Sequence, residues 1–286
     1  MTMAATLDLV GAAFAERYSV PAFNIFDDFS LRGVLRAAEE LRSPVIVQAS
    51  VKTVRVLGAA YLRALFLDRA SAVGVPASLH LDHCPDRAVI TEALRAGFDS
   101  LLFDASGLSF DEALAQTREV VAEARRHGAS VESEIEGIAG VEDGVGSDEE
   151  GVRYPVEQLA RFVAETGVDL FAPAIGTAHG RYLAAPRLSR ERITALVEAT
   201  GIPQVLHGGT GLTGEDFRDL VARGCAKTNV STAIKEAYLK SGRHHLTRAQ
   251  EQDHWDPPQF FEEVEVAVAA VAREHISTFG SAGKAG

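Results

Sequence analysis

An aspartate and a histidine stand side by side at the end of an apolar run, where Asp82 and His83 follow the segment ASLHL. Polar groups that leave water need hydrogen-bonding partners, so a buried strand gains nothing from such a pair at its tip. The pair therefore indicates either the start of a solvated loop or a site that both side chains face. Two further histidines have similar surroundings, His179 in GTAHG and His207 in LHGGTG.

Those three histidines are candidate metal ligands. Three neutral imidazoles with one open position are the ligand set of a catalytic zinc, which polarises a carbonyl as a Lewis acid. His83, His179 and His207 each follow a strand-like run, so we expect them to meet on one ion. A lone histidine is more often structural. We therefore expect His80 to belong to the strand wall, and the remaining histidines to be solvated or locally hydrogen-bonded.

The carboxylates divide by context. Asp82 adjoins an expected ligand and could pass a proton to and from a substrate oxygen, although it could also cap the helix that begins near Asp86. Glu134 and Asp104 end two other strand-like runs and could hold the metal in a second position, orient its ligands, or only hydrogen-bond within the fold. Glu142 lies in a glycine-rich loop, where a carboxylate is either a solvated charge or a base that a closing lid delivers.

An anion site is expected near the end of the chain. Residues 207–211 (HGGTG) lead toward a helix expected to begin near Gly214. Glycines let backbone amides approach an anion, and helix N-termini favour negative charge. Residues 229–232 (NVST) add amide and hydroxyl donors. A GG turn alone is more often only a turn, but its place between a histidine and a polar strand end favours phosphate binding.

The elements that must hold these groups form a regular alternation. Eight apolar or β-branched runs alternate with amphipathic stretches, at residues 20–25, 44–50, 77–82, 99–105, 129–135, 169–175, 203–208 and 226–232. The pattern predicts an α/β fold, a single (β/α)8 TIM barrel over residues 1–286. A doubly wound sheet is the alternative, but NIFDDFS at 24–30 lacks the glycine fingerprint of a dinucleotide fold. Barrel active sites lie at the carboxyl ends of the strands, where Asn24, Ser50 and the groups above fall.

Two segments interrupt the alternation. Residues 136–155 are rich in glycine and acid, and a loop of that length within a compact domain is usually a lid or a binding loop. Residues 241–286 are expected to form a C-terminal helical extension. Within it, 241–259 has the composition of a polar connection, and a last amphipathic helix is expected around 260–275.

Composition excludes several kinds of partner. The net charge of −12 argues against nucleic acid and against an anionic membrane surface, and no apolar run approaches the length of a membrane span. The first twenty residues lack the basic segment of a signal peptide and indicate an amphipathic helix. Cys84 and Cys225 are too few for a disulfide framework, which favours a reducing cytoplasm.

Five motifs in order, SLHLDHC, ESEI…GVEDG, AIGTAHG, LHGGTG and KTNVST, resemble those of the class II, zinc-dependent ketose-bisphosphate aldolases, the fructose- and tagatose-bisphosphate group. The similarity runs from PAFNIFD at 21–27 to FGSAGKA at 279–285. It implies an enzyme of carbohydrate metabolism such as glycolysis. The implied reaction is the reversible aldol cleavage of a ketose (bis)phosphate into dihydroxyacetone phosphate and an aldehyde such as glyceraldehyde 3-phosphate.

The resemblance also implies roles for individual residues. His83, His179 and His207 match the zinc ligands, and Glu134 and Asp104 match acids near an alternate metal position. Asp82 matches the acid–base residue on the aldehyde-side hydroxyl, and Glu142 matches the loop glutamate that takes a proton from the ketose phosphate. Substrate-binding positions, for which a monovalent cation (Na+ or K+) is often nearby, are matched by Asn24, Ser50, Gly180, Gly208, Gly209, Thr210, Asn229, Val230, Ser231 and Thr232.

Departures from the family pattern concern the aldehyde half of the substrate. Glu136 stands where glycine is usual, Pro173 interrupts the sixth strand, and no basic residue is assigned to a second phosphate. The aldehyde partner therefore stays open between glyceraldehyde 3-phosphate and a less usual compound, and so does the sugar stereochemistry. A homo-oligomer, dimer or tetramer, is expected because barrels with a long last helix often pair.

Three other functions were weighed. A Schiff-base aldolase would need a lysine, and Lys227 is the only one of five lysines on a predicted strand. A barrel metallohydrolase generally takes metal ligands from the first strand, which offers only Asn24. A non-catalytic metal-binding barrel would close its zinc with four protein ligands and leave no open position.

Overall fold

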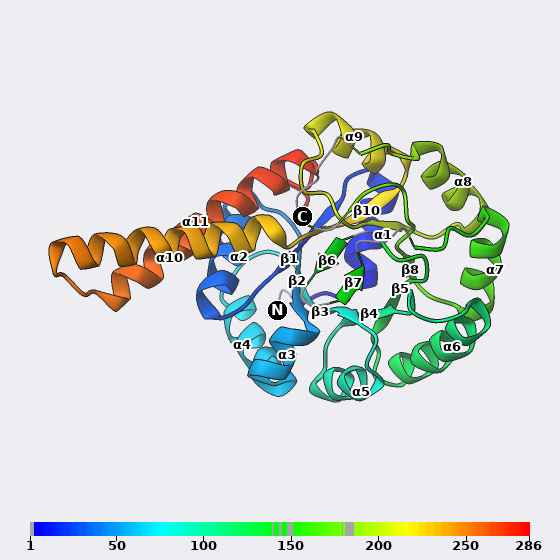
Figure 1. The fold of residues 1–286 in the computed structure, drawn as a ribbon, viewed down its shortest axis with the longest axis horizontal. Helices are drawn as coiled ribbons and strands as arrows, with labels where there is room; N and C mark the ends of the chain where they lie inside the picture. Colours follow the sequence, from blue (N-terminus) through cyan, green and yellow to red (C-terminus); the bar gives the residue numbers. More distant parts are fainter. Residues whose placement is uncertain (1–2, 139, 143–144, 148–150, 179, 181–185) are drawn as a thin grey trace.

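A computed structural model describes residues 3–138, 140–142, 145–147, 151–178, 180 and 186–286. Eight parallel strands close into a barrel in the order β1-β10-β9-β8-β5-β4-β3-β2, with helices around it (Figure 1). The predicted (β/α)8 barrel is therefore confirmed. The strands are β1 Val20–Asn24, β2 Val45–Ser50, β3 Ala77–Cys84, β4 Ser100–Asp104, β5 Ser130–Glu134, β8 Leu170–Phe171, β9 Gln204–Leu206 and β10 Cys225–Val230.

Each of the eight predicted runs contains a strand, and most of the strands are shorter than the predicted runs, β8 and β9 most of all. β8 ends at Phe171, two residues before Pro173, which has no N–H to donate to a neighbouring strand. β10 ends at Val230, so the prediction of strand for Ser231 and Thr232 is wrong. Ser231 is the N-cap of the next helix and Thr232 is its first residue.

The helices that surround the barrel begin and end at recognisable caps. The side chain of Asp86 accepts a hydrogen bond from the backbone N–H of Ala88, and Gly97 ends the same helix in a left-handed conformation. Asp86 therefore caps this helix, and Asp82 is not needed for that role. The helices are α1 Thr6–Glu16, α2 Asp28–Glu40, α3 Val51–Leu57, α4 Ala59–Ser71, α5 Arg87–Ala96, α6 Phe110–Arg126, α7 Val156–Thr166, α8 Arg190–Thr200 and α9 Gly214–Arg223.

The barrel interior is apolar at one end and polar at the other. At the amino end, residues of α1 such as Val10 pack with inward-facing strand residues such as Ala22, Ile46 and Val205. A larger cluster fills the space between the strands and the outer helices. α1 therefore closes the amino end of the barrel, and the candidate site residues lie toward the carboxyl end.

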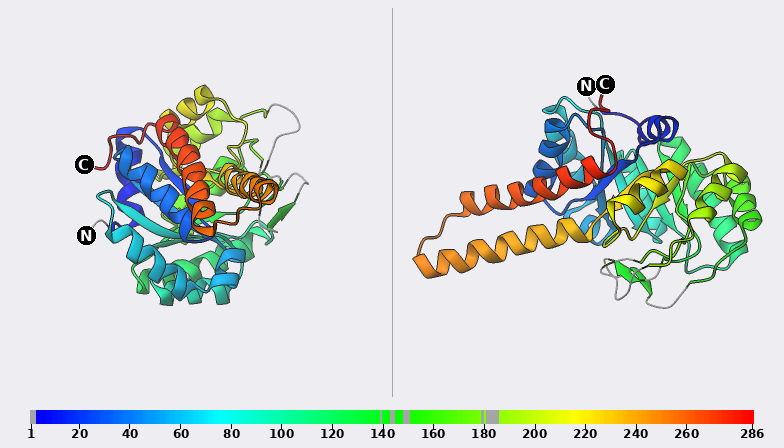
Figure 2. Two further views of the ribbon diagram at one scale, coloured as in Figure 1. Left: turned by 90° about the vertical axis from the view of Figure 1, so that its left-hand side faces the viewer. Right: turned by 90° about the horizontal axis from the view of Figure 1, so that it is seen from above.

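The glycine-rich segment contains structure of its own. β6 Gly140–Glu142 and β7 Val145–Ser147 pair antiparallel, with Glu142 opposite Val145. This small hairpin follows β5 and stands away from the barrel in the right-hand view of Figure 2. The expected loop of 136–155 therefore includes a hairpin.

The C-terminal region differs most from the prediction. Residues 241–259 are not a polar connection, because α10 runs over Thr232–Gln252 and α11 over Pro257–Thr278. The two helices lie antiparallel and project from the barrel as an arm (Figures 1 and 2). A Cβ on Gly242 would lie 3.2 Å from the ring of Phe260, so the two helices approach closely there. Few residues of α10 are buried, and its sequence therefore lacks the apolar stripe by which a helix is predicted.

No helix within the described residues has the length and apolar character needed to cross a membrane.

Candidate active site

Asp82 and His83 both face the barrel interior, although neighbouring residues of a regular strand point to opposite faces. The register between β3 and β4 shifts between Leu81 and Cys84, and His83 has a left-handed backbone with φ of 43°. This irregularity turns the imidazole inward. Both side chains are buried. The irregular backbone at this point explains how two residues that are neighbours in sequence face the same site.

A candidate metal centre lies next to that turn. His83, Glu134 and His207 each offer a ligand atom, and these atoms lie within 4.8 Å of one another. The rings of His83 and His207 have centroids 4.7 Å apart. Two imidazoles and a carboxylate in a dry interior are a donor set that suits zinc. The predicted third histidine, His179, lies outside the described residues.

The surroundings of His207 also favour a cation at this point. Its Nδ1 lies 3.0 Å from Glu134 Oε2, and its Nε2 lies 2.8 Å from Glu132 Oε1. Burial alone lowers the pKa of His207, but hydrogen bonds to the two glutamates outweigh burial and raise it. A carboxylate at each ring nitrogen of His207 favours positive charge between the two glutamates, and a divalent ion beside Nδ1 would supply it. The residues present therefore fit a metal ion.

Asp104 contacts the imidazole of His83, the other histidine of this cluster. Its Oδ2 lies 3.3 Å from His83 Nδ1, and its Oδ1 accepts hydrogen bonds from the backbone and hydroxyl of Ser106. Burial raises the pKa of Asp104, but the hydrogen bonds from His83 and Ser106 win and lower it to about 2. An ionised carboxylate on a ligand imidazole fixes the direction of that ring.

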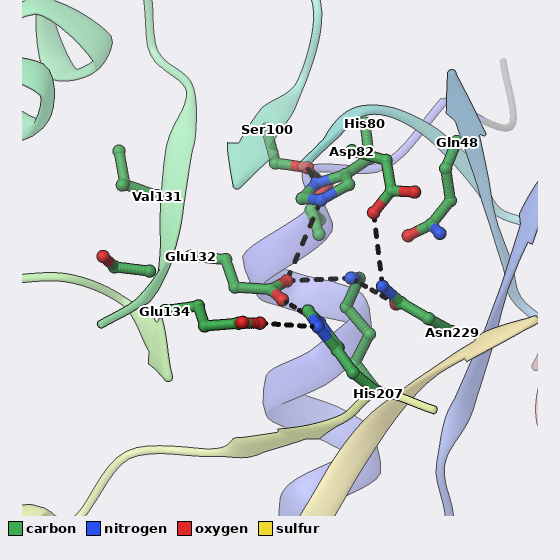
Figure 3. A network of polar contacts seen from close by, with 12 residues as sticks. Gln48, His80, Asp82, Ser100, Val131, Glu132, Glu134, His207 and Asn229 are labelled. Atoms are coloured by element: carbon green, nitrogen blue, oxygen red, sulfur yellow. Dashed lines mark hydrogen bonds and ion pairs between the residues drawn. The ribbon is translucent and has the colours of Figure 1, made fainter. Parts of the chain in front are cut away.

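Asp82, next to His83 on β3, lies among amide side chains. Asn24 Nδ2 donates to one carboxylate oxygen over 2.8 Å, and Asn229 Nδ2 donates to the other over 3.3 Å. Gln48 in turn donates to the amide oxygen of Asn24 over 2.9 Å. Figure 3 shows Asp82 pointing toward Asn229, with Glu132, Glu134 and His207 beyond it. Donors on both oxygens therefore fix the direction of this carboxylate.

Two buried charges that sequence reasoning did not single out as site residues lie beneath these groups. Lys227 and Glu132 are both fully buried, with Lys227 Nζ 2.8 Å from Glu132 Oε2. Burial would raise the pKa of Glu132, but Lys227 and His207 lower it well below its usual range. A signal for Glu132 was present in the ESE triplet, because Glu132 and Glu134 are two apart on one strand and therefore share a face.

A cavity of about 240 Å³ opens at the expected anion site. Gly209, Thr210, Gly214 and Asn229 are among the residues that line it, and α9 begins there. Gly208 has φ of 67°, and a Cβ on it would lie 2.6 Å from the carbonyl oxygen of Ala178, so only glycine fits. Val230 also lines this cavity, and the next residue, Ser231, is buried. Gly180 has a left-handed backbone.

A second cavity of about 340 Å³ lies at the end of β2. Its lining includes Ser50, Lys52, Lys235, Phe26 and Tyr238. Ser50 pairs in register with Asp82, so the cavity begins one strand away from the candidate acid–base residue. The two lysines were missed in the sequence because both lie in helices that follow strand ends, α3 and α10.

The glycine-rich segment is anchored at its return to the barrel. Glu136 is buried, accepts hydrogen bonds from the backbone of Tyr154 and Ala174, and forms an ion pair with Arg192 at 2.5 Å. The unusual residue at this position therefore ties the segment to two neighbouring parts of the fold. The backbone of Glu142 lies in β6, while its side chain is outside the described part of the molecule.

Comparison with known proteins gives one consistent picture. Residues 4–284 match the family model for fructose-bisphosphate aldolase class II. The chain is 36% identical over 268 residues to the D-tagatose-1,6-bisphosphate aldolase subunit GatY of Klebsiella oxytoca, covering 93% of this chain and 94% of that protein. It is 35% identical over 291 residues to the 6-phospho-5-dehydro-2-deoxy-D-gluconate aldolase of Bacillus subtilis, covering 100% and 98%.

Solved structures agree with the sequence relatives. A putative fructose-1,6-bisphosphate aldolase from Coccidioides immitis is similar with a TM-score of 0.90 at 32% identity, covering 98% of each chain. The YdjI aldolase of Escherichia coli is similar with a TM-score of 0.84 at 29% identity, covering 99% of this chain and 100% of that one.

Proposed function

The chain belongs to the class II fructose-bisphosphate aldolase family, and we propose that it catalyses the reversible aldol cleavage of a ketose (bis)phosphate into dihydroxyacetone phosphate and an aldehyde. As a class II aldolase it is a carbon–carbon lyase, and the family is generally zinc-dependent. The finer assignments below, of metal, residues and substrate, are the proposal.

The observation that carries the proposal is the cluster of His83, Glu134 and His207 next to Asp82. We assign His83, His207 and His179 as zinc ligands, with Glu134 and Asp104 near a second metal position. Zinc bound there would polarise the ketose carbonyl and stabilise the negative charge of the enediolate left by cleavage. The carboxylates of Glu134 and Asp104 beside His83 and His207 favour a dication over a neutral ligand.

Asp82 is the acid–base residue for the aldehyde side. In cleavage it takes the proton from the hydroxyl of the breaking bond, and in synthesis it returns that proton to the aldehyde oxygen. The donors on its two oxygens, from Asn24 and Asn229, fix the direction of the carboxylate. Glu142 is the loop base, which takes a proton from dihydroxyacetone phosphate in the synthetic direction and returns it after cleavage.

The cavity of about 240 Å³ receives the ketose phosphate. The N-terminus of α9 and the backbone of Gly208, Gly209 and Thr210 offer donors to an anion. Gly180, Val230, Ser231 and Thr232 complete the group, with a monovalent cation, Na+ or K+, nearby. Binding the phosphate here fixes the orientation of the reacting carbons.

The cavity of about 340 Å³ beside Ser50 receives the aldehyde half. Lys52 and Lys235 at its edge give it affinity for an anionic aldehyde such as glyceraldehyde 3-phosphate. The two curated relatives carry names with different substrates, a tagatose bisphosphate and a phosphorylated deoxygluconate, so an unusual aldehyde is the alternative.

The surroundings of Lys227 argue against the Schiff-base mechanism. A nucleophilic lysine needs an uncharged amine that substrate can reach. Lys227 is fully buried, 2.8 Å from the carboxylate of Glu132, and donates to Asn229. The amine of Lys227 is therefore engaged by Glu132 and Asn229 inside the barrel and is not exposed to substrate.

We further propose that the chain acts as a single barrel domain, in the cytoplasm, as a homo-oligomer.

The decisive experiment gives the zinc-loaded protein dihydroxyacetone phosphate and a panel of aldehydes that are unmodified, phosphorylated, sulfonated or carboxylated. Products are identified by mass and configuration. We expect condensation that a chelator abolishes and zinc restores, together with borohydride treatment that traps no lysine adduct. Turnover unaffected by the chelator, or a trapped lysine, would contradict the proposed mechanism.

A further inference from the structure

A fully buried lysine–glutamate pair lies in the middle of the barrel. The side chains of Lys227 on β10 and Glu132 on β5 both have 0% exposure, and Lys227 Nζ is 2.8 Å from Glu132 Oε2. Desolvating two charges offsets most of their attraction, so apolar residues of similar volume often replace such a pair without loss of stability. A contribution to stability is therefore not enough to explain why this buried pair is present. The other contacts that the two residues make suggest a second role.

Glu132 fixes the tautomer of His207. Its second oxygen, Oε1, lies 2.8 Å from His207 Nε2. An ionised carboxylate only accepts hydrogen bonds, so Nε2 carries the proton. The nitrogen that remains available to a metal is Nδ1, which is the one that faces Glu134 over 3.0 Å. A histidine ligand is commonly oriented in this way through its other ring nitrogen.

Lys227 fixes the amide of Asn229. An ammonium group only donates, so the atom of Asn229 that lies 2.7 Å from Lys227 Nζ is the amide oxygen. The amide nitrogen then faces the other way and donates to Asp82 Oδ1 over 3.3 Å. If the amide turned over, its oxygen would face an ionised carboxylate. The lysine therefore determines which group Asp82 meets.

The contacts form one continuous path across the barrel. It runs from His207 through Glu132, Lys227 and Asn229 to Asp82. Figure 3 labels His207, Glu132, Asn229 and Asp82 along this path. His80, packed 3.8 Å from Glu132 and bonded to Ser100, borders the pair from the amino end. The pair thus contacts both halves of the proposed machinery and lies beneath them.

We propose that Lys227 and Glu132 are positioning residues that act as one unit, Glu132 presenting His207 Nδ1 to the metal and Lys227 presenting the amide nitrogen of Asn229 to Asp82. This rests on the proposed function for the roles of His207 and Asp82. Neither residue touches substrate or metal. Their two effects are separable, because one concerns metal affinity and the other concerns the rate of proton transfer.

Glu132→Gln tests the first effect with little change in shape. The new amide oxygen accepts from Lys227, so its NH2 group faces His207 Nε2 and favours the tautomer with the proton on Nδ1. We expect zinc affinity, measured by competition with a chromophoric chelator, to fall about 10- to 100-fold. The visible spectrum of the cobalt-substituted protein should also change, and this readout does not depend on turnover.

Lys227→Met tests the second effect. We expect kcat at saturating zinc to fall on the order of tenfold or more, with KM changed much less, because orientation of Asp82 and not substrate binding is impaired. Zinc affinity should change less than in Glu132→Gln.

A single variant leaves one charge unpaired in the interior and could fail to fold. The double variant Lys227→Met/Glu132→Met removes both charges and every hydrogen bond that the two side chains make, and we expect a folded protein that has both defects. The matched control is Arg63→Met/Asp99→Asn, which removes a partly buried ion pair of 3.0 Å that lies away from the site. Circular dichroism measures the folded fraction of each protein.

Two results would overturn this inference. One is wild-type zinc affinity together with wild-type kcat in the folded double variant. The other is a loss no greater than that of the control pair. If the wild-type protein itself bound no zinc and formed no carbon–carbon bond, the proposed function would fail instead, so the two failures are distinguishable.

Discussion

The barrel interior and the C-terminal arm use charge and apolar surface in opposite ways. Inside the barrel, charged side chains such as Lys227 and Glu132 are fully buried and each has a partner. On the arm, apolar side chains are exposed, with 68% of Leu239, 55% of Leu246 and 63% of Trp255 accessible. Closed strands hold each interior residue from both sides, whereas α10 is held mainly by α11. Substitutions in the first region should therefore change chemistry, and substitutions in the second should change association.

The largest effect is expected from His207→Ala. Removing this imidazole should eliminate zinc binding and lower kcat/KM by at least about 10³-fold, because the developing negative charge loses its stabilisation. Zinc content by atomic absorption and a cleavage assay measure the two losses. His127→Ala, at an exposed helix end, is the matched control and should behave as wild type. Full zinc content in His207→Ala would remove His207 from the ligand set.

A smaller effect is expected from Asp82→Asn, which keeps the shape of the side chain and removes its basicity. Zinc should remain bound, and kcat should fall by about 10²- to 10⁴-fold, the range for loss of a general acid–base. Isotope exchange on dihydroxyacetone phosphate alone should persist, since that step is assigned to Glu142. Equal loss of exchange and cleavage would contradict separate roles for the two carboxylates.

Lys52→Gln should have a modest and selective effect. Lys52 is exposed at the edge of the cavity beside Ser50, and an exposed charge pair is worth up to about 1 kcal/mol. KM for phosphorylated aldehydes should therefore rise by about fivefold, whereas KM for neutral aldehydes should stay the same. The rise should shrink as salt is added, because salt screens exposed charges. An equal change for charged and neutral aldehydes would remove Lys52 from the binding of the anionic group.

The smallest effect on chemistry is expected in the arm. Leu246→Glu should change the free energy of unfolding by no more than about 0.5 kcal/mol, as exposed substitutions usually do, and leave kcat within twofold at a fixed state of association. Analytical ultracentrifugation should show weaker self-association, by about tenfold in Kd. Tyr61→Glu, at an exposed position on α4, is the control. A loss of kcat comparable to that of Asp82→Asn would end the distinction between the two regions.

The sequence predicted most of what depends on a period or a motif. Alternation of strands and helices predicted the barrel, and the position of His83, Asp104, Glu134 and His207 at predicted strand ends placed them at one edge of it. In the arm, the last helix expected around 260–275 is present as α11, whereas α10 was missed because a helix that packs on one neighbour needs few apolar positions. The residues 241–252 therefore have the composition of a solvated segment.

Glu132 and Lys227 could not be predicted for a different reason. Both lie inside strands and not at their ends, and a buried charge is expected only when its partner is known. That partner lies 95 residues away in sequence (227 minus 132) and meets it only when the barrel closes. Long-range pairing of this kind leaves no local pattern.

The left-handed backbone at His83 makes the order of the two residues as important as their identity. Position 82 is extended and aims at the amides, whereas position 83 is turned toward the imidazole of His207. Exchanging them, in the variant Asp82→His/His83→Asp, would preserve every atom of the protein and reverse both directions. Two isomeric chains of identical mass and charge would then differ in whether they hold an ion, and an inventory of side chains could not tell them apart.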